Sequence, residues 1–320
     1  MALVLWLTSL LPADAQPQER VRRIGFLSGG SSAVAGALVG AFREGLRDLG
    51  WVEGRNLIID FRFAEGQFDR LSDLAAELVR LKVDVIVAVP TPAALAARNA
   101  TATIPVVMIS VPNPVEIGLV DSLARPGRNV TGVAFSVGID IIGKEMQVLK
   151  EALPRIRSVA ILLNPSNPGH ALIPSKAKAD AESLGLSLRF VEARTLNDFD
   201  KAFAAMADAR VDAVLVVADS MFQAHRTRLA ELATRNRLPS VYAFREYVDA
   251  GGLMSYGPNL ASQYRQGAAY VDRILKGARP AELPVEQPTK FELVISLKAA
   301  KALGVTIPSS LRLRAEQIID

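Results

Sequence analysis

The 320-residue sequence predicts an α/β protein of two lobes, each built on an open, doubly wound parallel sheet, with three chain crossings between the lobes. Two observations predict this class: short apolar runs alternate with amphipathic helical patterns, and the pattern of the first half returns in the second. The length suits two domains of about 150 residues each. We expect the first lobe at residues 22–135 and 257–284, and the second at 138–254 and 288–320.

The predicted strands are nearly continuous in valine, isoleucine and leucine, which is typical of parallel strands buried on both faces. Helical patterns lie between them; Leu71, Leu74 and Leu78, for example, fall on one face of a helix. A later helical pattern at residues 263–276 is expected to pack on the first lobe. The strand-like runs are Ile24–Leu27, Leu57–Phe63, Asp84–Val89, Pro105–Ile109, Val130–Phe135, Ser158–Leu163, Leu186–Val191, Ala213–Val217 and Ser240–Tyr242.

An internal repeat relates the two halves of the chain. Arg22–Leu27 aligns loosely with Arg157–Leu162, and Ile104–Val107 aligns with Leu238–Val241, at offsets of 135 and 134 residues. Each pair is weak by itself, but several pairs in the same order at nearly constant offset indicate two lobes of the same topology.

The three crossings are expected near Ser136–Gly138, Ser255–Asn259 and Pro280–Pro288. Open parallel sheets bind ligands beyond the carboxyl ends of their strands. Two such lobes that face each other would form a cleft, with the crossings as its hinge.

Composition excludes several classes of site. Half of the residues are apolar and 22% are charged, which is the profile of a globular protein. There is no cysteine, and His170 and His225 are the only histidines, so we expect no metal site and no cofactor. The net charge of +4 is spread along the chain without a basic cluster, and about 20 residues before the first strand leave no room for a helix-turn-helix, so we expect no nucleic-acid partner.

Enzyme signatures are missing as well. The chain has no Gly-x-Ser-x-Gly nucleophile turn, no phosphate-binding Gly-Lys-Ser/Thr loop and no Gly-x-Gly-x-x-Gly fingerprint. The acidic residues form no pair whose spacing indicates acid–base chemistry. We therefore expect a binding protein with no catalytic residues.

The first fifteen residues resemble a signal peptide. Leu3–Leu11 is apolar but too short to span a bilayer, and Pro12 and the small-x-small triplet Ala13–Ala15 follow it. An ordinary N-terminal helix is the alternative. We expect residues 1–15 to be removed on export, which would place the mature protein in the periplasm.

Candidate ligand-binding residues follow the predicted strands or lie before a crossing, where the two lobes would face each other. They are Ser31, Ser32, Thr91, Pro92, Asn113, Asp219, Ser220, Tyr242, Glu246 and Tyr256.

Hydroxyl groups beside helix N-termini suit a carboxylate, so Ser31, Ser32 and Thr91 are predicted to bind one. Asp219 is the one acidic residue directly at a strand end, and it is predicted to bind an ammonium group. Each has a plainer interpretation: Asp219 and Thr91 are also well placed to cap the helices that follow them. Together they favour an amino acid as ligand, because both ends of a zwitterion are matched.

Two tyrosines are predicted to pack against the ligand side chain, Tyr242 after a strand and Tyr256 before the second crossing. Tyr256 is equally consistent with a packed hinge residue. Glu246 lies one turn further and is predicted to adjust specificity.

Seven segments together resemble the periplasmic ABC-transporter substrate-binding proteins of the TrpX-like type, over residues 22–319. The resemblance implies a type I periplasmic binding fold and delivery of a small solute to an ABC permease in the inner membrane; some members are linked to aromatic amino acids. The segments are Arg23–Leu27, Gly45–Asn56, Thr91–Ala97, Gly118–Val120, Leu123–Gly132, Gly251–Gly257 and Leu283–Thr289.

Two positions depart from that family. Asn113-Pro114-Val115 stands where the family often has Asp-Pro-Val, and Asp219-Ser220 where it often has Asp-Pro. From the resemblance and the candidate residues together, we expect a monomeric receptor that closes on a small amino-acid-like ligand, aromatic or branched. The alternatives are a sensing module for a signalling partner and a receptor for another organic acid.

Overall fold

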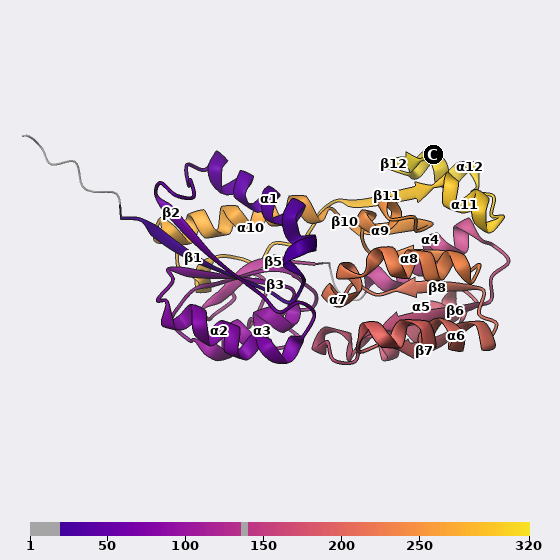
Figure 1. Ribbon diagram of the computed structural model, residues 1–320, viewed down its shortest axis with the longest axis horizontal. Helices are drawn as coiled ribbons and strands as arrows, with labels where there is room; N and C mark the ends of the chain where they lie inside the picture. The colour runs from indigo at the N-terminus through magenta and orange to yellow at the C-terminus, as the bar shows by residue number, and fades with distance from the viewer. Residues whose placement is uncertain (1–19, 136–139) are drawn as a thin grey trace, which may run out of the picture.

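The computed structural model describes residues 20–135 and 140–320 and shows two α/β lobes side by side along the long axis (Figure 1). Each lobe carries a mainly parallel sheet with helices on both faces, which confirms the predicted fold class. The expected signal peptide, residues 1–15, lies outside the described residues.

The first lobe contains β1 (Arg22–Ser28), α1 (Ser32–Asp48), β2 (Leu57–Phe63), η1 (Phe68–Arg70), α2 (Leu71–Arg80), β3 (Val85–Val89), α3 (Thr91–Ala100), β4 (Val106–Val111), β5 (Val130–Ala134), α10 (Leu260–Leu275) and η4 (Pro280–Glu282). Its five strands are parallel, in the order β2-β1-β3-β4-β5. Val85 and Val87 of β3 pack with α1 and α10, whereas Ile86 and Ala88 pack with α2 and α3. Successive side chains of β3 therefore pack into two separate cores, one on each face of the sheet, which is why β3 is buried throughout.

Helix α10 comes late in the sequence but packs on the first lobe beside α1, as the pattern at residues 263–276 predicts (Figure 1). Gly45 of α1 allows this approach, since an added Cβ would lie 3.0 Å from the Cβ of Ala268. Gly267 allows α10 to approach the sheet in the same way: an added Cβ there would lie 2.3 Å from Cδ1 of Ile109. The first lobe is therefore completed only after the chain has built most of the second and returned.

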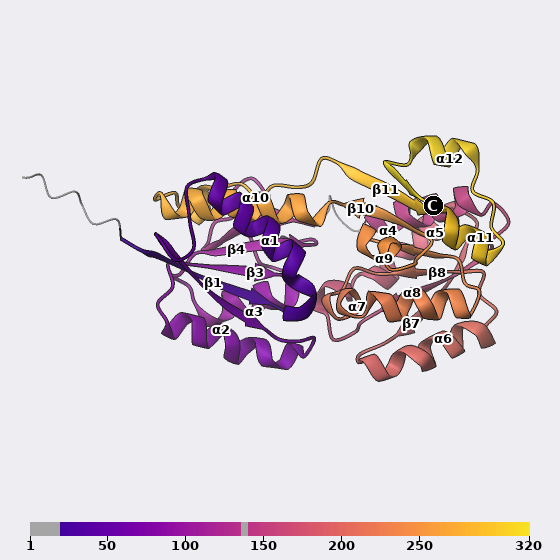
Figure 2. The ribbon, with the colours of Figure 1, turned by 45° about the horizontal axis from the view of Figure 1, so that its top comes forward.

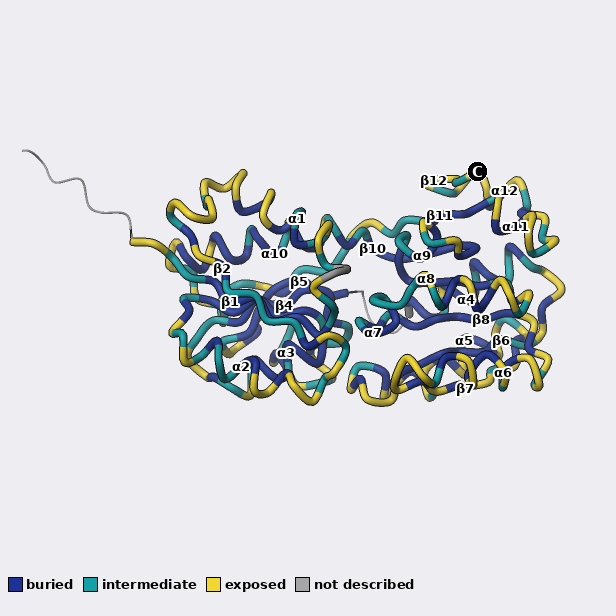
Figure 3. The backbone as a smooth tube through the Cα atoms, in the orientation of Figure 1, coloured by how far each residue is buried: buried dark blue, intermediate teal, exposed yellow. Residues whose placement is uncertain are grey.

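The second lobe contains α4 (Asp140–Ala152), β6 (Ser158–Leu163), η2 (Pro168–His170), α5 (Ile173–Ser183), β7 (Ser187–Glu192), η3 (Leu196–Asp198), α6 (Phe199–Asp208), β8 (Ala213–Val216), α7 (Ser220–Ala224), α8 (Arg226–Arg235), β9 (Ser240–Tyr242), α9 (Arg245–Asp249), β10 (Met254–Pro258), β11 (Phe291–Ser296), α11 (Leu297–Leu303), α12 (Ser309–Arg314) and β12 (Gln317–Ile319). Its sheet has the order β12-β11-β10-β9-β8-β6-β7. The run β7-β6-β8-β9-β10 repeats the order of the first sheet, so the predicted common topology is confirmed. The central strands of both sheets are buried (Figure 3).

Three strands of the second sheet are missing from the sequence prediction. Residues 255–259, expected as a crossing, mostly belong to β10, which pairs with β9 and β11. The pairing of β10 with β11 is antiparallel, whereas purely parallel sheets were expected. The reason is the path of the chain: β10 leads out of the second lobe and β11 returns beside it (Figure 2).

Hydrogen bonds join the described residues at the second and third crossings and at the end of β5. The first crossing, expected near Ser136–Gly138, lies outside the described part of the chain. Asn259, in the second, caps α10 with its side-chain oxygen and donates to the Glu292 carboxylate at 3.2 Å, beside the third. Gln263 donates to the carbonyl of Ala134 at 3.1 Å, just before the first crossing. These contacts bring the second and third crossings close to the end of β5, where a hinge would have to lie.

Candidate functional site

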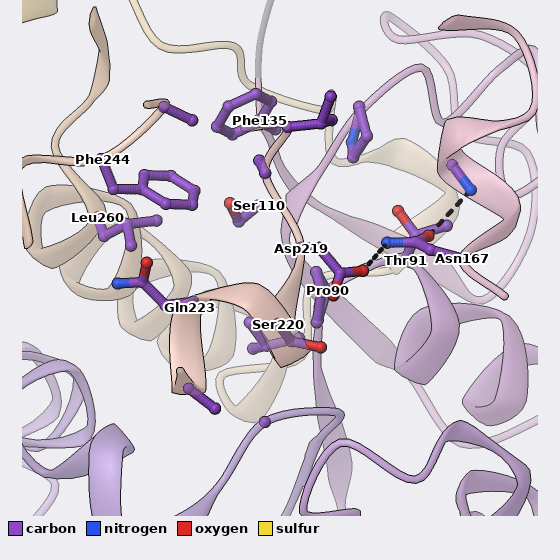
Figure 4. A pocket seen from close by; sticks show the side chains of 18 of the residues that line it. Pro90, Thr91, Ser110, Phe135, Asn167, Asp219, Ser220, Gln223, Phe244 and Leu260 are labelled. Carbon is purple, nitrogen blue, oxygen red and sulfur yellow. Dashed lines mark hydrogen bonds between the residues drawn. The ribbon is translucent and has the colours of Figure 1, made fainter. Parts of the chain in front are cut away.

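A cavity of about 200 Å³ lies between the lobes, where the carboxyl ends of both sheets face each other (Figure 4). The loops after β1, β3 and β4 form one wall, and the loops after β6, β8 and β9 form the other. This is where two facing open sheets should bind a ligand. The size suits a small molecule.

The first-lobe wall is rich in hydroxyl groups. Ser28, Ser31, Thr91 and Ser110 all line the cavity. Thr91 opens α3, and α1 begins just after Ser31, so the N-termini of two helices of 10 and 17 residues lie at this wall. Helix N-termini carry partial positive charge and N–H groups without helical partners, which favour an anion.

The second-lobe wall holds a buried polar cluster around Asp219, which is 3% exposed. The Asp219 carboxylate accepts from Asn167 Nδ2 at 2.9 Å and from the N–H of Met221 at 2.9 Å, so it caps α7. His170 accepts from the N–H of Asn164 through Nδ1 and contacts the carbonyl of Ala218 through Nε2, at 3.0 and 2.9 Å. These contacts fix Asp219 as a rigid anionic group at the cavity wall, and His170 is a structural residue of the same cluster.

The opposite end of the cavity is apolar. Figure 4 shows Phe135, Phe244 and Leu260 together, away from Asp219 and Asn167. Phe135, from the first lobe, and Phe244, from the second, meet edge to face with centroids 5.6 Å apart. The cavity therefore has one end suited to charge and hydrogen bonds and another suited to a ring or branched chain.

Four buried polar atoms of the lining lack a hydrogen-bond partner. Buried polar groups are paired in the great majority of cases, so an unpaired set in one cavity indicates a place where a ligand supplies the partners. All four belong to the second lobe: Oε2 of Glu145, Oγ of Ser220, Oε1 of Gln223 and Oε2 of Glu246.

Burial raises the pKa of both glutamates of this set. Desolvation alone raises the pKa of Glu145 well above its ordinary value. Burial is also the main cause of the raised pKa of Glu246; the Asp249 charge adds to it, and Arg245 and Arg226 oppose it. Burial first, and the Glu246 charge second, raise the pKa of Tyr264, which lines the cavity from α10. Protons are thus held more tightly here than in water.

Within residues 20–135 and 140–320, no group of three or more histidines, aspartates and glutamates is placed to hold a metal ion. The same residues contain no helix both long and apolar enough to cross a membrane.

The structure brings six of the ten predicted residues to the cavity: Ser31, Thr91, Asn113, Asp219, Ser220 and Glu246. Ser32 is exposed and its N–H donates to Glu65 at 3.0 Å, one residue past the lining. Pro92 is buried in the first turn of α3 and does not line the cavity.

Neither predicted tyrosine lines the cavity. Tyr242 is fully buried in the core of the second lobe, where its ring stacks on Tyr247 with centroids 4.5 Å apart. Tyr256 lies on β10 and stacks on Phe291 of the returning strand, with centroids 5.9 Å apart. The packed-hinge interpretation of Tyr256 agrees with this position.

Sequence reasoning missed the residues of the apolar end. Phe244 lies only two residues past β9, so the rule that ligands bind beyond strand ends could have identified it. Glu145 lies on the same helix face as Ile141 and Ile142. A single acidic residue on an apolar helix face is the sequence pattern that could have identified it.

The two lobes are in contact around the cavity. Gly169 of the second lobe lies close to Thr91 of the first: a Cβ added at Gly169 would lie 3.2 Å from Oγ1 of Thr91. Lys176 forms an ion pair of 2.9 Å with Glu116 across the rim. The two lobes therefore touch each other directly beside the cavity.

Comparison with known proteins gives a consistent result. A family model described as "ABC transporter substrate binding protein" matches residues 26–319. A tyrosine-binding protein of Clostridioides difficile is 27% identical over 265 residues, 82% of this chain and 75% of that protein.

Two solved structures are informative. A domain from Streptococcus pneumoniae in complex with L-Trp is 27% identical, with a TM-score of 0.86 over 93% of this chain and 99% of that one. The ligand-free, open structure of a substrate-binding protein with adhesive properties from Clostridium difficile is 26% identical, with a TM-score of 0.67 over 93% of this chain and 99% of that one.

Proposed function

The chain belongs to the family of ABC transporter substrate-binding proteins, and from this premise we propose that it is the receptor of an ABC importer that captures an aromatic amino acid between its lobes. The family consists of substrate-binding proteins, so the chain is a binding protein with the type I periplasmic binding fold and not an enzyme. The observation that carries the proposed ligand is the two-ended cavity, with Asp219 at one end and Phe135 and Phe244 at the other.

The polar end fits the two charges of an amino acid. Thr91, Ser110 and the N-termini of α1 and α3 offer hydroxyl and N–H donors to a carboxylate. Asp219, held by Asn167 and by its cap on α7, offers an anion to the ammonium group. A desolvated charge pair of this kind is worth more than an exposed one, because water no longer screens it.

The apolar end fits a ring. Phe135 and Phe244 present aromatic faces and edges, and Ile141, Ile142 and Leu260 surround them. Aromatic pairs add about 0.5–1.5 kcal/mol beyond the burial of area. The relatives that bind tryptophan and tyrosine support an aromatic side chain over a merely branched one.

Closure of the lobes is the proposed mechanism. At almost equal identity and coverage, the structure is more similar to the tryptophan complex than to the open, ligand-free relative. The contacts of Gly169 with Thr91 and of Lys176 with Glu116 exist only while the lobes face each other closely. A ligand that bridges both walls would favour this state over an open one by its differential contacts.

The setting completes the proposal. Residues 1–15 would direct export to the periplasm, where the closed, monomeric receptor would deliver its ligand to an ABC permease in the inner membrane.

A thermal-shift screen tests the ligand class. The protein is unfolded, washed and refolded to remove any ligand acquired during expression, then screened with amino acids, their amides, decarboxylated and des-amino forms, organic acids, sugars and nucleosides. A ligand that binds only the folded state stabilises it by about 2.7 kcal/mol at a hundredfold excess over Kd. We expect a shift with an aromatic amino acid and none with its amide or amine. Shifts with organic acids alone would contradict the amino-acid proposal, and shifts with sugars would replace it.

A further inference from the structure

Glu145 is a carboxyl group that neither the fold nor the proposed zwitterion site uses. It lies on α4, lines the cavity and is 1% exposed. Its Oε2 is buried without a hydrogen-bond partner, and no ion pair or hydrogen bond of its side chain is found within the described residues. Burying a lone carboxyl destabilises a fold, so a ligand-binding role explains its presence better than a structural one.

Glu145 stands apart from the charged residues of the cavity. Asp219, Glu246 and Arg226 also line it, but none of them forms a hydrogen bond or ion pair with Glu145, and burial raises the pKa of its carboxyl. No cationic side chain pairs with Glu145 within the described residues, so its burial favours the neutral form of the carboxyl group. A neutral carboxyl offers a carbonyl acceptor and an O–H donor.

The surroundings of Glu145 are those of the apolar end. Ile141 and Ile142 precede it by one turn and line the cavity with it. Helix α4 packs against β9 and β10, and Phe244 follows β9. Glu145 therefore places one hydrogen-bonding group on the apolar face of α4 that lines the cavity.

We propose that Glu145 hydrogen-bonds the polar atom on the ring of an aromatic amino acid, a phenol O–H or an indole N–H, and so selects such rings over one without a donor. This rests on the proposed function. The phenol O–H and the indole N–H can each donate to the carbonyl oxygen of the Glu145 carboxyl. The phenol oxygen can also accept from the carboxyl O–H. A ring without a donor leaves Glu145 unpaired, and leaving a buried polar group unpaired is what allows strong discrimination.

Calorimetric titration of the refolded protein with tyrosine, tryptophan and phenylalanine tests this. The wild type should bind tyrosine or tryptophan at least about tenfold more tightly than phenylalanine. Glu145→Leu should remove most of that preference while keeping or improving phenylalanine binding. Glu145→Gln, which keeps a neutral donor and acceptor, should stay within about threefold of the wild-type preference.

Two variants serve as controls. Glu151→Gln changes another glutamate of the same helix. Glu151 forms an ion pair of 2.5 Å with Arg314 and does not line the cavity, so this variant should leave the preference unchanged. Gln223→Leu removes another unpartnered oxygen of the lining, which belongs to a residue beside Leu260. If Gln223→Leu abolishes the preference and Glu145→Leu does not, the inference is wrong.

The remaining outcomes also separate. A wild type that prefers phenylalanine, or a Glu145→Leu variant with an unchanged ratio of affinities, would overturn the role of Glu145 and leave the proposed function standing. Failure of the wild type to bind any of the three would overturn the proposed function, and the inference with it. Because the ratio is measured within each variant, a general loss of stability does not imitate the expected result.

Discussion

The side chain of Asn167 donates a 2.9 Å hydrogen bond to the carboxylate of Asp219 at the wall of the interlobe cavity. The same carboxylate accepts from the N–H of Met221, so its position is set by the start of α7 and by the loop after β6 together. Asp219 thus has a structural role whatever it binds, and any experiment on it has to separate the two roles.

Asp219→Asn makes that separation, because an amide keeps an oxygen for the helix cap and removes the charge. If Asp219 pairs with the ligand ammonium, affinity for the amino acid should fall by about 1.5–3 kcal/mol, roughly ten- to a hundredfold. The des-amino acid of the same side chain should be unaffected. Equal losses for the two ligands in calorimetry would mean that Asp219 acts only as a cap.

Phe244 should determine the preference for rings. It is 7% exposed and meets Phe135 edge to face across the lobes. Phe244→Leu keeps an apolar side chain but loses the ring, so we expect the preference for phenylalanine over leucine to fall about threefold to tenfold. Phe244→Ala should weaken both ligands and lower the melting temperature. An unchanged ratio in Phe244→Leu would place the ligand ring elsewhere.

The ion pair between Lys176 and Glu116 should make a small contribution to closure. Both side chains are more than 40% exposed, and exposed pairs contribute about 0–1 kcal/mol. Lys176→Glu should therefore reduce affinity by no more than a few-fold, with a larger effect at low salt. The double exchange with Glu116→Lys should restore affinity. A loss that persists at high salt and in the double exchange would argue against a screened ion pair.

Glu145 should make the ligand-free protein less stable as pH rises. Burial raises its pKa in the folded state, so above its ordinary value near 4.5 the folded protein retains a proton that the unfolded chain has released. The free energy of unfolding therefore falls with rising pH until the raised pKa is passed. Glu246 shifts in the same direction, so the test compares variants instead of the wild type alone.

Urea unfolding at pH 5 and pH 8 provides the measurement. Glu145→Gln should lose less stability than the wild type between the two values, because its side chain does not titrate. Glu145→Leu should melt higher than the wild type without ligand, since an unpaired polar group is replaced by an apolar one. The same slope with pH in wild type and Glu145→Gln would show that Glu145 is not protonated in the folded state.

The local sequence predicted much of the fold. Buried strands such as β3 are continuous in Val, Ile and Ala because helices cover both faces, and that pattern needs no tertiary information. The repeat predicted a common topology for the same reason. Strand β11 was not predicted, because its pairing with β10 depends on where the third crossing re-enters the second lobe.

The candidate site divides along the same line. The rule of strand ends brought Ser31, Thr91 and Asp219 to the cavity, because the topology of a parallel sheet fixes which end of each strand is open. It did not distinguish Tyr242, whose ring is buried against Tyr247, from Phe244 two residues later, which faces the other lobe.

The sequence by itself therefore determined most of the elements, the common topology of the two lobes and the edge at which a ligand would bind, but not strands β10, β11 and β12. Only the tertiary structure decided that Phe135 meets Phe244 and that Glu145 lines the cavity unpaired. Those contacts join residues of separate lobes, or a helix face and a loop. They depend on how the lobes are oriented, and hydrophobic periodicity along the chain carries no record of that orientation.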